Sequence, residues 1–238
     1  MNRRLLLLSN SRDAEGRFLH HPRRQIRAFL GGRIRSVLFI PFAGVTTPWD
    51  AYAELARAAF AEMGYALESI HAAEDRLAAI RSVEAIVVGG GNTFHLLSHL
   101  HETGLLDVIR ERVNAGVPYI GWSAGSVVAC PTIRTTNDMP IIEPRSLAAL
   151  GLVPFQVNAH YTDFHPPGFQ GETRAQRLSE FLVVNPDVRV VGLPEGMMLQ
   201  VERDRVALLG EGSAKVFASG CAPRDVLPSE SLDFLLRA

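Results

Sequence analysis

The sequence predicts an α/β fold, a three-layer sandwich in which helices cover both faces of a mostly parallel central sheet. Short apolar runs alternate with amphipathic segments along most of the chain, the pattern of repeated strand–helix–strand units. The run 36–41 is apolar after its first residue, as expected for a strand buried on both faces. Glycine-rich loops follow two other runs, and parallel sheets carry their functional groups beyond the carboxyl ends of strands.

The elements of the first half follow from apolar periodicity and turn residues. We expect strands near 5–8, 36–41, 66–70, 85–88 and 117–120. Helices are expected at 22–30, 48–63, 74–81, 94–100 and 105–114. The helix after residue 47 has the clearest start, with Thr47 as N-cap, Pro48 at its first position and Asp50 in its first turn.

The second half is less regular. A polar loop is expected at 132–142, followed by strands at 153–158 and 189–193, with a loop and a helix at 172–184 between them. Short runs at 199–202, 206–209 and 215–218 are expected to form a small antiparallel extension. The chain has no linker, internal repeat or low-complexity segment, so residues 1–238 are predicted to form a single domain.

Composition and charge exclude several classes of function. The 238 residues are 47% apolar and 21% charged, which is typical of a globular protein. A net charge of −1 provides no basic surface for nucleic acid, and no apolar segment approaches the length of a membrane span. The apolar run at the N-terminus has four residues, too few for a secretory signal. We therefore expect a cytoplasmic protein that binds neither nucleic acid nor membranes.

Cysteine and histidine patterns do not predict a metal site or a cofactor. The two cysteines, Cys130 and Cys221, form neither a disulfide framework nor a ligand set, and we expect both to be buried in a reducing compartment. His95 and His99 have the i, i+4 spacing of a metal pair, but the H-E-x-x-H pattern is absent. A solvated helix face is the expected setting of these two histidines.

The segment 121–125, Gly-Trp-Ser-Ala-Gly, connects a predicted strand to a short helical run that Pro131 ends. A G-x-S-x-G sequence in this position is typical of a nucleophile elbow, which exposes the hydroxyl of Ser123 on a sharp turn. A tight turn around a buried serine fits the five residues equally well. The neighbouring loop 89–92 lacks the residues of a phosphate-binding loop. Its backbone suits an oxyanion hole formed by the N–H groups of Gly91 and Ala124, although close packing of strand and helix also fits.

A serine nucleophile needs a base and an acid that orients the base. His160 and His165 follow Ser123 in the sequence, and His160 is favoured because it comes directly after a predicted strand. Candidate acids are Glu195, Asp138 and Asp163. Glu195 is favoured because it also follows a strand, so that all three groups would meet at one rim of a parallel sheet. The order Ser, His, acid differs from that of α/β-hydrolases.

The chain resembles peptidase E, the α-aspartyl dipeptidase family of serine peptidases, which is related to class I glutamine amidotransferase-like folds. The segments that carry the resemblance are 7–11, 39–45, 88–94, 121–125, 129–141, 171–174 and 192–196. The resemblance implies a Ser123–His160–Glu195 triad and hydrolysis of dipeptides with an N-terminal aspartate. The sequence departs from the family at Ala159, where proline is commoner, and at Ser126 and Met197.

An aspartyl substrate requires a group that matches a side-chain carboxylate, and arginine does so with two hydrogen bonds. Arg174 is the first choice, followed by Asn92 and Arg134. The expected partner is a small peptide, and the expected state is a monomer or homodimer without a cofactor. Alternatives are a related hydrolase of β-aspartyl or cyanophycin-like bonds and a non-catalytic small-molecule-binding module on the same fold.

Overall fold

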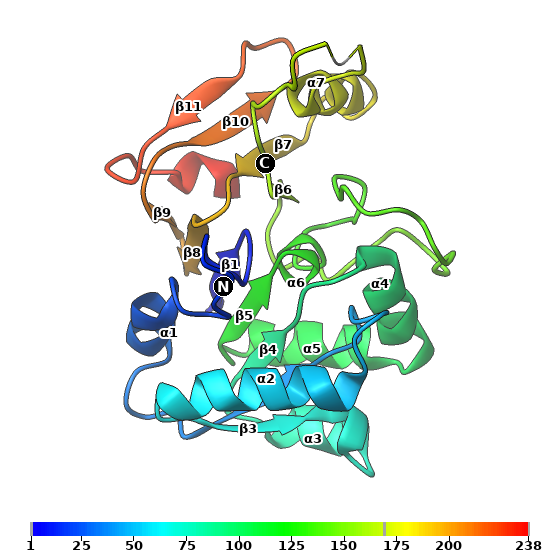
Figure 1. Ribbon diagram of the computed structural model, residues 1–238, viewed down its shortest axis with the longest axis vertical. Helices are drawn as coiled ribbons and strands as arrows, with labels where there is room; N and C mark the ends of the chain where they lie inside the picture. Colours follow the sequence, from blue (N-terminus) through cyan, green and yellow to red (C-terminus); the bar gives the residue numbers. More distant parts are fainter. Residues whose placement is uncertain (1, 169, 238) are drawn as a thin grey trace.

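The structure, a computed structural model, describes residues 2–168 and 170–237, and these residues contain two sheets (Figure 1). The larger sheet has the strand order β3-β2-β4-β5-β1-β8-β9, in which the first five strands are parallel and the last two antiparallel. Its strands are β1 (Arg4–Leu8), β2 (Ser36–Ile40), β3 (Ala66–Ser69), β4 (Ile86–Val88), β5 (Tyr119–Trp122), β8 (Met198–Glu202) and β9 (Arg205–Leu209). The predicted, mostly parallel central sheet is confirmed.

Helices cover both faces of the larger sheet because successive strand residues point to opposite faces. Leu6 and Phe39 belong to the core on one face, whereas Leu7 and Ile40 belong to the core on the other. The first face is covered by α1 (Arg23–Leu30) and α2 (Trp49–Glu62). The second face is covered by α3 (Arg76–Ser82), α4 (Thr93–Glu102), α5 (Leu105–Asn114) and α6 (Ala124–Val127). The three-layer arrangement is therefore as predicted.

The smaller sheet lies beside α6, with α7 on its outer face (Figure 1). Its strand order is β11-β10-β7-β6, in which β6 and β7 are parallel. Its elements are β6 (Gln156–Ala159), β7 (Arg189–Leu193), β10 (Ala214–Ala218), β11 (Arg224–Val226) and α7 (Arg174–Val184). The expectation that the three groups share the rim of one sheet is wrong, because β6 pairs with β7, and β7 pairs with β10, in a sheet that does not contain β5. The expected antiparallel extension is divided, since β8 and β9 extend the larger sheet.

Two 3-10 turns, η1 (Ile70–Ala72) and η2 (Asp233–Leu236), complete the described elements. The prediction of Thr47 as N-cap is wrong: α2 starts at Trp49, and Pro48 occupies the cap position without a side-chain hydrogen bond. Cys130 is buried as expected, but Cys221 is exposed on the turn after β10. Among the described residues, no helix combines the length and apolar character that crossing a bilayer requires.

Candidate active site

Ser123 occupies a sharp turn between β5 and α6, as the elbow pattern predicts. Its φ of 51° and ψ of −115° are rarely adopted by a residue with a side chain, and such strain is typical of functional sites. The N–H of Ser123 donates to the carbonyl of Leu8 at 3.1 Å, which holds the turn against the end of β1. Gly125 is required for close packing, because a Cβ there would overlap the carbonyl of Val88.

The glycine loop after β4 lies directly beside this turn. A Cβ on Gly90 would lie 3.0 Å from the Cβ of Ser123, and a Cβ on Gly91 would overlap the Ala43 carbonyl. The Tyr52 hydroxyl fixes the loop by accepting from the N–H of Gly90 at 3.0 Å and donating to its carbonyl at 3.1 Å. Burial raises the pKa of Tyr52 to about 12, so the phenol keeps its proton at neutral pH. Within the described residues, the N–H groups of Gly91 and Ala124 make no hydrogen bond to the protein.

The structure brings Ser123, His160 and Glu195 together. The Nε2 atom of His160 lies 3.0 Å from the Oγ atom of Ser123, and its Nδ1 atom lies 2.7 Å from Oε1 of Glu195. His160 directly follows β6 and also has a left-handed backbone, with φ of 53°. Glu195 lies in the turn after β7. Because β6 and β7 are neighbouring parallel strands, their carboxyl ends present the imidazole and the carboxylate side by side.

Three consecutive residues at the end of β1 contact all three of these segments. The Leu8 carbonyl holds the Ser123 turn, as described above. The Ser9 hydroxyl accepts from the N–H of His160 at 2.9 Å and donates to the Leu193 carbonyl at 2.8 Å. The Oδ1 atom of Asn10 accepts from the N–H of Gly196, the residue after Glu195, at 2.8 Å. Ser9 is fully buried. The end of β1 therefore joins the elbow on the larger sheet to the two strand ends on the smaller one.

Replacing Ser9 with alanine is expected to lower kcat by roughly 10- to 100-fold, because the strained backbone of His160 loses its hydrogen-bond acceptor. The free energy of unfolding should fall by about 1–3 kcal/mol, since a buried N–H is left without a partner. Steady-state kinetics and denaturant unfolding measure the two effects. Ser69→Ala is the matched control, because Ser69 is a buried serine whose hydroxyl contacts Phe39 and His71 at the outer strand β3. Equal losses of kcat in both variants would contradict a positioning role of Ser9.

Two cavities adjoin the hydroxyl of Ser123. The larger, of about 700 Å³, lies on the side of α2 and the glycine loop. The smaller, of about 180 Å³, is bordered by α6, by the 136–138 segment and by Arg174 at the start of α7. Ser123, His160 and Asp138 line both cavities. A peptide bond placed at Ser123 would therefore have one residue in each cavity.

Besides His160, the smaller cavity is lined by two ionisable side chains, those of Asp138 and Arg174. The Oδ2 atom of Asp138 accepts from the backbone N–H of Thr93 at 2.8 Å and from the Thr136 hydroxyl at 3.0 Å, which leaves Oδ1 for a ligand. Arg174 is half-buried and forms no ion pair with any described carboxylate. Burial, followed by repulsion from Arg177, lowers the pKa of the Arg174 guanidinium. An anionic group that enters this cavity could therefore pair with Arg174, for which the described residues supply no carboxylate partner.

The other candidate residues have different surroundings. Asn92 lines the larger cavity, but its side chain caps α4 through the N–H of His95 and donates to the Met139 carbonyl at 2.8 Å. Arg134 is exposed and lines neither cavity. The carboxylate of Asp163 accepts from the Tyr161 hydroxyl at 2.6 Å, and this bond together with the Lys215 ammonium lowers the pKa of Asp163. Neither Asp163 nor Asp138 contacts the imidazole of His160, whereas Glu195 does.

His95 and His99 are not on a solvated face, which corrects the expectation for them. Both are half-buried and pack beside Trp49, with ring centroids 6.5 and 5.2 Å from its ring. The Nδ1 atom of His95 lies 2.6 Å from the Phe42 carbonyl. In the described part of the chain, no group of three or more His, Cys, Asp or Glu residues is arranged to hold a metal ion.

Comparison with known proteins identifies the family. The sequence profile of Peptidase family S51 matches residues 5–209. The chain belongs to peptidase family S51. A relative named Peptidase E from Nostoc sp. is 52% identical over 236 residues, which cover 99% of this chain and 98% of the relative. Peptidase E of Salmonella newport is 50% identical over 216 residues, or 91% of this chain and 94% of the relative.

A solved structure agrees with the fold. A peptidase from an acI-B1 actinobacterium superposes with a TM-score of 0.71 at 18% identity, covering 98% of this chain and 97% of that one. The resemblance that the sequence motifs indicated is confirmed, and the chain is a serine-type peptidase. Sequence reasoning did not anticipate the contacts of Ser9, Asn10 and Tyr52. Ser9 and Asn10 lie within the segment 7–11, which contributes to the family resemblance, but the sequence does not show which residues their side chains contact.

Proposed function

We propose that this peptidase hydrolyses dipeptides with an N-terminal aspartate through an acyl-enzyme, with Ser123, His160 and Glu195 as its catalytic triad. The observation that carries the proposal is the series of contacts from Glu195 through His160 to Ser123, 2.7 and 3.0 Å long, between two cavities that both adjoin Ser123. The smaller cavity would hold the aspartyl residue, and the larger cavity would hold the residue that leaves.

The first half of the reaction forms the acyl-enzyme. The Oγ atom of Ser123 attacks the aspartyl carbonyl carbon while Nε2 of His160 accepts the hydroxyl proton. Glu195, at Nδ1, keeps the imidazole in the tautomer that can accept this proton and stabilises the imidazolium. The negative charge on the carbonyl oxygen is stabilised by the N–H groups of Gly91 and Ala124, which no other group of the described protein uses. His160 then protonates the amine, which leaves with the second residue.

The second half releases the product. A water molecule takes the place of the departed amine, and His160 removes its proton as it attacks the acyl carbon. A second tetrahedral oxyanion forms in the same position. Its collapse breaks the ester bond, and the proton on His160 returns to Oγ of Ser123, which restores the starting state and frees aspartate.

Recognition of the aspartyl residue follows from the charges of the smaller cavity. An N-terminal aspartate carries an ammonium and a side-chain carboxylate. In this proposal Oδ1 of Asp138 would accept from the ammonium, and Arg174 would pair with the carboxylate through two hydrogen bonds, since both residues line the cavity. The volume of about 180 Å³ is large enough for one amino-acid residue.

A dipeptide panel tests the proposed function. Purified protein is assayed with α-linked Asp-Leu, Glu-Leu and Asn-Leu and with β-linked Asp-Leu, and kcat/KM is measured for each. We expect α-Asp-Leu to exceed Asn-Leu by about 10²-fold or more, since Asn-Leu has the same shape without the charge that Arg174 would bind. Preference for the β-linked peptide would favour the β-aspartyl hydrolase alternative. Absence of turnover on every member of the panel would refute the proposal.

A further inference from the structure

The larger cavity has mostly apolar walls and one cationic group. Phe18, Val45, Leu55 and Ile141 supply apolar surface around the side of Ser123 where the leaving residue would lie. Arg12 and Asp138 carry the full charges among the lining residues, and Asp138 also borders the smaller cavity. Arg12 is therefore the fully charged residue that lines the larger cavity and not the smaller one.

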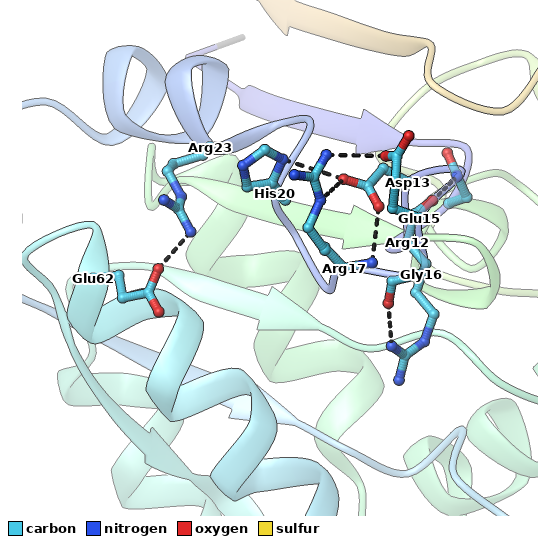
Figure 2. Close-up of polar contacts among 9 residues, drawn as sticks. Arg12, Asp13, Glu15, Gly16, Arg17, His20, Arg23 and Glu62 are labelled. Carbon is cyan, nitrogen blue, oxygen red and sulfur yellow. Dashed lines mark hydrogen bonds and ion pairs between the residues drawn. The ribbon is translucent and has the colours of Figure 1, made fainter.

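Arg12 lies in the loop after β1, where the other charged side chains neutralise one another (Figure 2). Arg17 pairs with Asp13 at 2.8 Å and with Glu15 at 2.9 Å, and His20 lies 3.2 Å from Asp13. The side chain of Arg12 points away from this group. Among the described residues it forms no ion pair.

The protein holds the guanidinium of Arg12 without neutralising it. Nη1 donates to the Gly16 carbonyl at 2.6 Å, and the guanidinium carbon lies 5.7 Å from the centre of the Phe18 ring. Phe18 in turn packs edge-on against Trp122, the residue before Ser123, with centroids 5.8 Å apart. The Asn10 side chain donates to the Arg12 carbonyl at 2.6 Å. The arginine is thus tied to the same loop end that contacts the turn after Glu195. Its Nε and Nη2 atoms donate to no other described residue, so both could donate to a ligand.

We propose that Arg12 binds the C-terminal carboxylate of the leaving residue, so that the larger cavity is a subsite for one apolar amino acid with a free carboxylate. The proposal rests on the proposed function, because it assigns the leaving group of the aspartyl substrate to this cavity. A guanidinium forms charge-assisted hydrogen bonds with a carboxylate, and the apolar wall suits a side chain such as leucine. An amidated or extended second residue would leave the guanidinium without its anion. The loop after β1 would thereby restrict the enzyme to dipeptides.

The test compares two substrates that differ in this carboxylate alone, Asp-Leu and Asp-leucinamide. Wild-type enzyme is expected to prefer Asp-Leu. Arg12→Gln should lower kcat/KM for Asp-Leu by roughly tenfold or more, mainly through KM, and leave kcat/KM for the amide unchanged. Arg12→Lys should retain part of the preference, because it keeps the charge and loses the two-bond geometry. Because Arg12 is exposed, we expect both variants to fold as wild type does.

Arg17→Gln is the matched control, since Arg17 belongs to the same loop but is already paired with Asp13 and Glu15. We expect it to behave as wild type on both substrates. Equal losses on Asp-Leu and the amide in Arg12→Gln, or no loss on either, would overturn the carboxylate assignment while leaving the proposed function standing. Wild-type enzyme that hydrolyses neither aspartyl substrate would refute the proposed function and the subsite together.

Discussion

Replacing Ser123 with alanine is expected to reduce kcat on Asp-Leu by about 10⁴- to 10⁶-fold, the loss observed when a triad enzyme is left with its oxyanion hole and binding groups. The fold should persist, because the hydroxyl lies at the border of two cavities and alanine meets the same backbone constraint at φ of 51°. Steady-state kinetics gives the loss, and thermal unfolding followed by circular dichroism confirms that the variant is folded.

Ser126 provides the matched control three residues further along. Its hydroxyl is fully buried, and its one proton can be donated to the carbonyl of Leu8 at 2.7 Å or to that of Gly121 at 2.9 Å. Ser126→Ala should therefore lower the free energy of unfolding by about 1 kcal/mol while its kcat remains within about tenfold of wild type. Turnover of the Ser123→Ala variant at a rate near that of Ser126→Ala would show that Ser123 is not the nucleophile.

Replacing Arg174 with methionine is expected to lower kcat/KM for Asp-Leu by about 10²- to 10³-fold, which corresponds to roughly 3–4 kcal/mol. The reason is that the substrate carboxylate would be desolvated in the smaller cavity without a partner. The value for Asn-Leu should stay constant or rise, since that side chain makes no ion pair. The effect is measured as the ratio of the two kcat/KM values, because a general loss of activity lowers both values and leaves their ratio unchanged.

Arg177 is a suitable control on the same helix. It is exposed, lies one turn from Arg174, and reaches Glu172 only at 3.8 Å. Arg177→Met should leave the Asp-Leu to Asn-Leu ratio close to wild type. If Arg174→Met lowers kcat/KM for Asp-Leu and for Asn-Leu by the same factor, Arg174 supports the structure or the chemical step and does not select aspartate.

The larger sheet and the turn that carries Ser123 could be predicted because local patterns determine them. Apolar runs such as 5–8 and 36–41 are buried on both faces. The elbow needs glycine at positions 121 and 125, because a Cβ atom at either position would overlap neighbouring backbone atoms. His160 and Glu195 could be paired with Ser123 because each follows a strand. The structure confirms that His160 directly follows a strand and that Glu195 lies in the turn after one, although β6 and β7 belong to the smaller sheet and not to the sheet that carries Ser123.

The two-sheet arrangement could not be predicted, since strand pairing across long separations leaves little trace in one sequence. The runs that form β6 and β7 read like the other parallel strands, and only the tertiary structure pairs β7 with β10. The roles of Ser9 and Asn10 were hidden for the same reason. Ser9 contacts His160 across 151 positions of the chain, and Asn10 contacts Gly196 across 186. Asp138 is ambiguous in the sequence, because an acid that binds an ammonium and an acid that orients a histidine look alike.

Labelling with a serine-directed fluorophosphonate tests most directly whether Glu195 and His160 activate Ser123. The account predicts one adduct per chain, mapped to the peptide that contains Ser123, formed rapidly in wild-type enzyme and at least about 10²-fold more slowly in His160→Gln. Labelling that is absent from Ser123, or equally fast when His160 is replaced, would contradict it.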